Sequence, residues 1–334
     1  MISMRRMAQL SRLVGVLFVL VLCASGATAT ASPYAQVFAN KNATGEELAK
    51  AFFALLSETG SPAGTVGTTA QQDAASKALV KPYLDSALIV QRATGERYIA
   101  ADYLPADVDD FKIGDVRVAQ PADGVIVVRY SVRVTETLPE AALVMGKDKA
   151  PRMTVFHWNV ADGRWKILSH ANFNTPIAAI CNATGMGTHD VRSPASPEDQ
   201  ALGERLIGRF YDLVMQGDSA PILHPQMQFQ SASGVGYTTL AERKSSTQYV
   251  DIRYRKPVVT RNGRLLVVST YNTTEQRTLM QNNQLRASEA GNLSTFIQGA
   301  DGQWSMIAVA AFAPPKALPD GAACVKAGPI EKAP

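Results

Sequence analysis

The chain has 334 residues, enough for two domains of ordinary size that each bury a core without help from metals or disulfides. Hydrophobic residues make up 46% and charged residues 19%, a balance that excludes disordered and fibrous proteins. The net charge of +4 comes largely from three arginines in the first 31 residues, which leave 30 basic against 29 acidic residues. The remainder has no Lys/Arg run interleaved with aromatic residues, so we expect no nucleic-acid partner.

Residues 1–31 have the pattern of a secretory signal peptide. Arg5, Arg6 and Arg12 precede an apolar run over residues 13–22, and small residues follow, ending in Ala-Thr-Ala-Thr-Ala. The run is shorter than the roughly 20 residues that a membrane-spanning helix needs, although an uncleaved anchor remains the alternative. We therefore expect an exported protein, periplasmic or secreted, with no membrane attachment after cleavage.

The chain that follows contains two similar copies of one unit. Residues 161–173 read ADGRWKILSHANF, and residues 300–312 read ADGQWSMIAVAAF. Two further pairs have the same spacing: Asp-Gly at 123–124 matches Asn-Gly at 262–263, and QRATG at 91–95 matches QSASG at 230–234. Asp-Gly and Asn-Gly favour tight hairpin turns. Three blocks at one offset indicate a tandem duplication.

The first copy is predicted to begin with a helix and continue as an antiparallel sheet. Thr44 and Glu47 form a capping-box pattern at the start of an amphipathic stretch. Residues 60–75, which have no counterpart in the second copy, are predicted to be an inserted loop. Strands are expected near residues 87–93, 111–119, 125–137, 152–160 and 164–173. Helices followed by strands are typical of an α+β fold.

The second copy repeats this order after a linker at residues 182–195, which is rich in Gly, Ser and Pro. Ser196, Pro197 and Asp199 predict the start of its helix. Strands are expected near residues 226–231, 250–259, 264–275, 292–299 and 303–312. We thus expect a first domain at 40–181, a second at 196–315, and a loosely ordered tail at 316–334.

A helix-led unit that ends in a hairpin reading DG-x-W-K-I-L-S-H-A-N-F-N resembles the nuclear transport factor 2-like (SnoaL-like) superfamily. The resemblance covers nearly the whole chain after residue 31, once per copy. It implies two tandem cone-shaped α+β domains, each with N-terminal helices and a curved antiparallel sheet around a ligand-binding cavity. Separate domains of this superfamily often pair through their sheets, so the resemblance implies an intramolecular pseudo-dimer.

No sequence motif identifies a reaction. The nucleophile elbow, the phosphate-binding loop, Cys-x-x-Cys and His-Glu-x-x-His are all missing. Enzymes of the superfamily use carboxylates, histidines or tyrosines inside the cone, but none of their motifs matches here residue by residue. The general candidates for catalysis are His157, Tyr130 and His170, with strand-end acids at Asp110, Asp115 and Glu136.

Strand alternation assigns these residues to faces. On the last strand of the first copy, one face is predicted to line the cone, and it holds Trp165, Ile167, Ser169, Ala171 and Phe173. His170 falls on the other face, where we expect it to meet the second sheet. Tyr130, Trp158, Trp165 and Ser169 are the candidate ligand-binding residues, although core packing is the simpler explanation for the aromatic ones.

Two cysteines remain after the signal peptide, Cys181 and Cys324, at comparable places in the two copies. They either form a disulfide or stay as free thiols. The sequence suggests no metal site and no cofactor.

Two functions remain open. The first is an exported protein that binds a small apolar molecule or a partner without catalysis. The alternative is an enzyme of isomerase, dehydratase or cyclase type that acts on a small apolar substrate in the first domain. The first is preferred because no carboxylate is clearly placed on an interior face.

Overall fold

The computed structural model describes residues 32–59, 70–103, 105–108, 110–138, 143–180, 191–238, 247–278, 285–322 and 324–325. Contacts divide the chain into Met1–Pro33 and Tyr34–Pro334, and the features below belong to the second unit. The predicted signal peptide lies outside the described residues. Across the described ranges, no helix is both long and apolar enough to cross a membrane.

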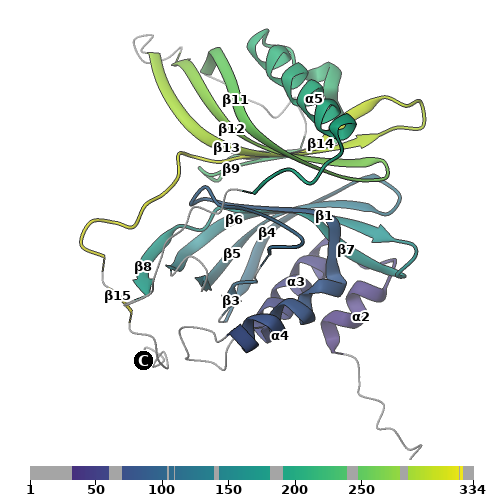
Figure 1. The fold of residues 1–334 in the computed structure, drawn as a ribbon, viewed down its shortest axis with the longest axis vertical. Coiled ribbons are helices and arrows are strands. Elements are labelled where there is room, and N and C mark those ends of the chain that lie inside the picture. Colours follow the sequence, from purple (N-terminus) through teal and green to yellow (C-terminus); the bar gives the residue numbers. More distant parts are fainter. Residues whose placement is uncertain are drawn as a thin grey trace, which may run out of the picture. The chain divides into compact units, whose positions relative to one another are not determined.

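Three helices form the helical layer of the first half, and Figure 1 shows them together on one face of its sheet. They are α2 (Pro33–Ala39), α3 (Gly45–Thr59) and α4 (Ala70–Val80), with the short helix η1 (Lys81–Tyr83) after them. The predicted capping box is confirmed, because Glu47 N donates to Thr44 Oγ1 over 3.2 Å and Thr44 N to Glu47 Oε2 over 2.7 Å. The predicted loop at 60–75 is wrong at its end, where α4 begins.

The first sheet is antiparallel except where β1 runs parallel to β7 and β15 runs parallel to β8. Its main order is β4-β5-β6-β7-β1-β2, and β8 pairs with the first part of the long strand β6. The strands are β1 (Leu84–Arg92), β2 (Arg97–Ile99), β3 (Asp107–Val108), β4 (Lys112–Ala122), β5 (Val125–Leu138), β6 (Leu143–Asn159), β7 (Arg164–Asn172), β8 (Pro176–Ile180) and β15 (Cys324–Val325).

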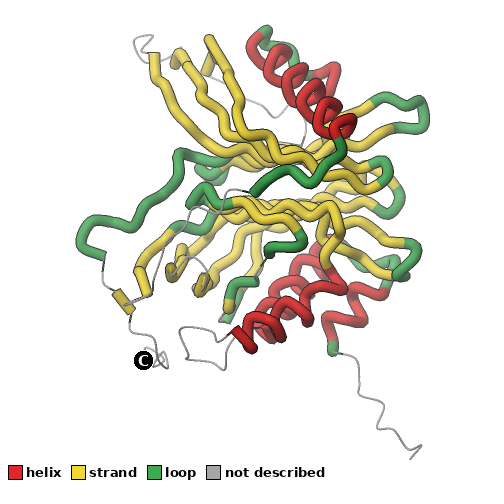
Figure 2. The backbone as a smooth tube through the Cα atoms, in the orientation of Figure 1, coloured by secondary structure: helices red, strands yellow, loops and turns green. Residues whose placement is uncertain are grey.

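The second half repeats this plan with one long helix, capped by Ser196 as predicted. Its sheet has the order β10-β9-β14-β13-β12-β11. Figure 2 shows strands and helices in both halves. The elements are α5 (Pro197–Met215), η3 (Ala220–Ile222), β9 (Leu223–Ser231), β10 (Gly236–Tyr237), β11 (Thr247–Asn262), β12 (Leu265–Thr278), β13 (Leu285–Gln298) and β14 (Trp304–Ala311). The predicted α+β class is confirmed.

The described part of the tail, residues 316–322 and 324–325, returns to the first half. Lys316 N donates to Ala93 O over 3.1 Å, and Leu318 packs on the first core. Further along, Cys324 pairs with Ala179 in the β15–β8 ladder. The Pro- and Ala-rich composition predicts irregular backbone, and these contacts attach its described residues to the first half.

A β-bulge overturns the predicted faces of the last strand. Val155 of β6 pairs with Ser169, and the next residue, Phe156, pairs with Ile167, so Leu168 is an extra residue in β7. One extra residue reverses the alternation of every side chain beyond it. Trp165 and Ile167 therefore face the first core, as predicted, whereas Ser169, Ala171 and Phe173 face away from it. The prediction was wrong for these three residues.

The same bulge recurs in the second half, where Thr295 pairs with Ala308 and Phe296 with Met306, leaving Ile307 as the extra residue. Beyond both bulges the reversed faces meet in one apolar cluster with residues from both sheets, including Ala171, Phe173, Ala310 and Phe312. Ser169 Oγ also lies 3.1 Å from Thr295 Oγ1. The two halves therefore share a core.

Candidate functional site

The interior of the first half holds a buried ion pair between Glu136 of β5 and Arg152 of β6. The pair forms because both residues follow the inward alternation of their strands. Arg152 Nη2 donates to Glu136 Oε2 over 3.0 Å, and the two side chains are 0% and 2% exposed. A buried charge requires such compensation, because an unpaired one would cost several kcal/mol.

Two asparagines complete the coordination of Glu136. Asn172 Nδ2 lies 3.2 and 3.0 Å from the two carboxylate oxygens, and Asn174 Nδ2 donates to Oε2 over 2.9 Å. Burial acts to raise the pKa of Glu136, but Arg152 and the two amides outweigh it and hold this pKa below its usual value. Glu136 is therefore an ionised carboxylate whose two oxygens both accept hydrogen bonds.

A second chain of hydrogen bonds links Tyr130, Thr154 and His170. Thr154 Oγ1 lies 2.9 Å from Tyr130 Oη and 2.8 Å from His170 Nδ1. The His170 ring packs edge-on against Phe52 of α3, with centroids 5.0 Å apart. Thus His170 lies inside the first half, and its predicted position between the sheets is wrong because of the bulge at Leu168.

Burial and the charge of Arg152 lower the pKa of His170 to about 3, so this imidazole is neutral near pH 7. Burial also raises the pKa of Tyr130. Neither group is suited to take a proton at neutral pH, because a general base works best when its pKa lies near the operating pH.

His157 lies on the opposite face of the first sheet and pairs with an acid that the sequence did not indicate. Its Nδ1 is 3.2 Å from Asp85 Oδ2, and Asp85 also accepts from Ala87 N over 2.9 Å. Asn262 of the second half donates to both oxygens of Asp85, over 3.0 and 2.7 Å. Burial acts to raise the pKa of Asp85, but the bonds from His157, Ala87 and Asn262 leave this pKa lowered.

The remaining candidates from the sequence do not converge on one place. Trp165 is buried and donates from Nε1 to Asn40 O over 2.9 Å, and half-buried Trp158 packs against it with centroids 5.6 Å apart. Ser169 lies between the sheets, where its Oγ contacts Thr295 Oγ1 of the second half. Asp115 is exposed at the surface, where it accepts from Ser131 Oγ over 2.6 Å.

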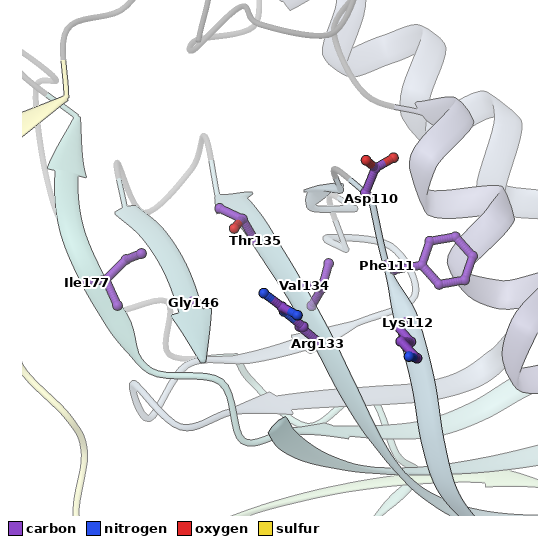
Figure 3. Close-up of a pocket in the computed structure, with 8 residues that line it drawn as sticks. All are labelled: Asp110, Phe111, Lys112, Arg133, Val134, Thr135, Gly146 and Ile177. Atoms are coloured by element: carbon purple, nitrogen blue, oxygen red, sulfur yellow. The ribbon is translucent and has the colours of Figure 1, made fainter. Parts of the chain in front are cut away.

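A pocket of about 680 Å³ lies against the last part of β5, between the start of β4 on one side and β6 and β8 on the other, and we call it the edge pocket. Figure 3 shows Ile177 of β8 and Gly146 of β6 on one side, residues 110–112 on the other, and β5 between them. The lining combines apolar and charged side chains: Asp110, Phe111, Lys112, Arg133, Val134, Thr135, Gly146 and Ile177. Of the predicted candidates, only Asp110 lines it.

Cys324 is disulfide-bonded. Its expected partner, Cys181, lies outside the described residues, so the pairing stays a prediction. Within the described ranges, no group of three or more His, Cys, Asp or Glu side chains could hold a metal ion.

Sequence reasoning named Glu136 but missed its partners. Glu136 lies opposite Met145 in the β5–β6 ladder, so strand register alone does not point from Glu136 to Arg152. Register does link Arg152 to Asn172, which lie opposite each other in the β6–β7 ladder. No local signal distinguishes Asp85, which becomes significant only through His157 and Asn262, at distances of 72 and 177 residues along the chain.

No protein-family model matches the chain, and no curated protein matches it. Solved structures do. An NTF2-like protein from Cytophaga hutchinsonii is 17% identical, with 36% of this chain and 99% of that one covered and a TM-score of 0.30. An NTF2-like superfamily protein from Salmonella enterica is 15% identical, with 37% and 94% covered and a TM-score of 0.31.

An NTF2-like protein of unknown function in nutrient uptake, from Rhodospirillum rubrum, is 14% identical, with 34% and 98% covered and a TM-score of 0.29. Each of these structures spans about a third of this chain. All three of these solved structures are named NTF2-like, the superfamily that the chain was expected to resemble.

Proposed function

We propose that this chain is a small-molecule-binding protein built from two fused NTF2-like halves, and that its ligand occupies the edge pocket. The observation that carries the proposal is the lining of that pocket. Ile177 and the half-buried Phe111 offer apolar contact beside the core residue Val134, while Asp110, Lys112, Arg133 and Thr135 offer polar groups. A few polar groups around an apolar surface are typical of small-molecule sites.

The buried groups of the first half support binding over catalysis there. The Glu136 carboxylate accepts from Arg152, Asn172 and Asn174, so its lone pairs are engaged and its basicity is low. The lowered pKa of His170 makes it a weak base, and the raised pKa of Tyr130 keeps this phenol protonated. A proton-transfer step would need one of these groups to be released first.

Export belongs to this proposal as well. It rests on the signal-peptide pattern of residues 1–31, which lie outside the described residues. Processing between residues 27 and 32 would be seen as a mature N-terminus in that range by mass spectrometry of protein from its own source.

Native mass spectrometry of protein from its own source tests the binding proposal. We expect a species heavier than the polypeptide by the mass of a retained molecule. Thr135→Trp fills the edge pocket and should remove that species, whereas Thr273→Trp, at an exposed position of β12, should keep it. Empty wild-type protein, or equal retention in the two variants, would contradict the proposal.

A second candidate function is acid–base chemistry at His157. Asp85 engages Nδ1 of His157, which leaves Nε2 available, and the His157 side chain is 22% exposed. An acid that orients a histidine in this way is a common arrangement for a general base. The test is exchange of α-protons of small ketones with deuterated water, followed by NMR. Catalysed exchange that His157→Gln abolishes would support this function, and exchange at the uncatalysed rate would reject it.

A further inference from the structure

A second cavity, of about 660 Å³, lies between α4 and the beginning of β1, and we call it the lysine pocket. It shares no residue with the edge pocket. Its lining is Lys77, Ala78, Lys81, Leu84, Asp85, Ser86, Ala100, Ala101, Tyr103 and Lys166. This volume falls within the range of small-molecule sites.

The charges that this cavity offers to a ligand are positive. Three lysines line it against one acid, Asp85, whose side chain is 0% exposed. The bonds that Asp85 accepts from His157, Ala87 and Asn262 engage both of its oxygens. Asp85 therefore neither meets a ligand directly nor pairs with the lysines.

The three lysines differ in their partners. Lys166 forms an ion pair with Asp162, and this carboxylate weakens the electrostatic attraction between Lys166 and an anionic ligand. Lys77 and Lys81 are exposed and lie four residues apart, so they project from the same side of the helical segment. Among the side chains that the structure describes, which do not include that of Asp73, no carboxylate lies within salt-bridge distance of either.

The rest of the lining is apolar or small. Leu84 and Tyr103 are 7% and 5% exposed and belong to the first core, and the other apolar lining residues, Ala78, Ala100 and Ala101, have small side chains. An apolar floor with two ammonium groups at the rim matches an amphipathic anion, because the floor buries hydrocarbon and the lysines compensate the charge.

We propose that the lysine pocket binds a molecule with an apolar body and one anionic group, such as a carboxylate or sulfonate, with Lys77 and Lys81 holding the anion. This site is separate from the edge pocket, so the two proposals succeed or fail independently.

Two fluorescent probes that share an aromatic body test the proposal: anilinonaphthalene sulfonate, which is anionic, and phenylnaphthylamine, which lacks the sulfonate. In Lys77→Ala/Lys81→Ala we expect the Kd of the sulfonate to rise about ten-fold, since exposed ion pairs are partly screened, while that of the neutral probe stays the same. Lys77→Arg/Lys81→Arg should restore sulfonate binding. Lys41→Ala/Lys50→Ala, which changes net charge equally, should have no effect.

A blocking variant locates the probe. Ala101→Trp should abolish sulfonate binding, whereas Ala201→Trp, at an exposed position of α5, and Thr135→Trp, in the edge pocket, should not. Sulfonate binding that survives Ala101→Trp, or a lysine variant that weakens both probes equally or neither, would overturn the proposal. A failure of the edge pocket appears separately, in the native mass spectra of Thr135→Trp.

Discussion

Phe173 and Phe312, which occupy the same place in the two copies of the repeat, stack on each other with ring centroids 4.5 Å apart and planes 24° from parallel. Phe173 directly follows β7 and Phe312 directly follows β14, and each ring packs against the other half. Two equivalent residues of the repeat thus contact each other, as equivalent residues do across a two-fold interface between identical subunits.

This stack should contribute to the stability of both halves together. Phe312→Ala is expected to lower the free energy of unfolding by about 3 kcal/mol, the usual cost of removing a buried Phe. Phe173→Ala should behave in the same way, and a double-mutant cycle in urea should show a coupling of about 1 kcal/mol. Phe229→Ala, in a half-buried stack with Tyr237 within the second half, is the control and should cost less. Additive effects of Phe173→Ala and Phe312→Ala would contradict a direct stack.

Breaking the Glu136–Arg152 pair should be more damaging than replacing it. Arg152→Met leaves a buried carboxylate with only its amide donors, and we expect a loss of about 3–5 kcal/mol in the free energy of unfolding. The double variant Glu136→Leu/Arg152→Met removes both charges and should recover part of that loss. Urea unfolding at pH 7 measures both variants. A double variant less stable than Arg152→Met would show that the charges themselves stabilise the fold.

His170 should make the fold less stable in mild acid. The lowered pKa of His170, about 3 against the ordinary 6.5, means that the unfolded chain binds a proton there first. Stability therefore falls as the pH drops below 6.5, by up to about 1.4 kcal/mol per pH unit, and this loss ends near the folded pKa. His170→Val, which places the residue found at 309 in the second half, should flatten the profile.

Urea midpoints between pH 7 and pH 5 isolate this effect of His170. Asp85 and Glu136 also have lowered pKa values, but their contributions are lost only below the ordinary carboxylate range. His224, whose pKa burial lowers to a lesser degree, has the same sign, so His224→Gln is the matched control. Equal slopes in wild-type and His170→Val protein would show that His170 is not kept neutral by the fold.

The cysteines should resist alkylation unless they are first reduced. We expect a Cys181–Cys324 bond in the mature protein, so iodoacetamide without reductant should leave the mass unchanged and treatment after reduction should add two groups. Cys181→Ser should then produce a free thiol at Cys324. Alkylation of the unreduced wild-type protein at both positions would rule this bond out.

Much of the fold could be predicted because the duplication presents each turn and strand pattern twice in the sequence. Turns at Gly124 and Gly163 recur at Gly263 and Gly302, all four with positive φ, so the hairpins were fixed by residues that tolerate this conformation. Short strands such as β2 and β10 were missed because two or three residues carry no alternation. Strands β6 and β13 begin earlier than predicted: the early part of β6 is interrupted by a glycine and charged residues at 146–149, and that of β13 is mostly polar or small.

The candidate site was predicted less well because of one β-bulge and one contact between the two sheets. Period-two alternation placed Trp165 correctly, but the extra residue at Leu168 reversed His170 and Ser169, and no turn residue or glycine marks that bulge in the sequence. The Asp85–His157 contact depends on Asn262 from the second sheet. Such a contact follows from packing, which strand patterns alone do not encode.

The return of β15 to β8 has a consequence for how the chain can be divided. A strand that lies after the second half in sequence belongs to the first half in space, so no single cut separates two complete sheets. Fragment 32–190 would lack β15, and fragment 191–334 would carry β15 without its partner β8. Mixed together, they would be expected to reassemble by strand complementation, in the manner of a split protein.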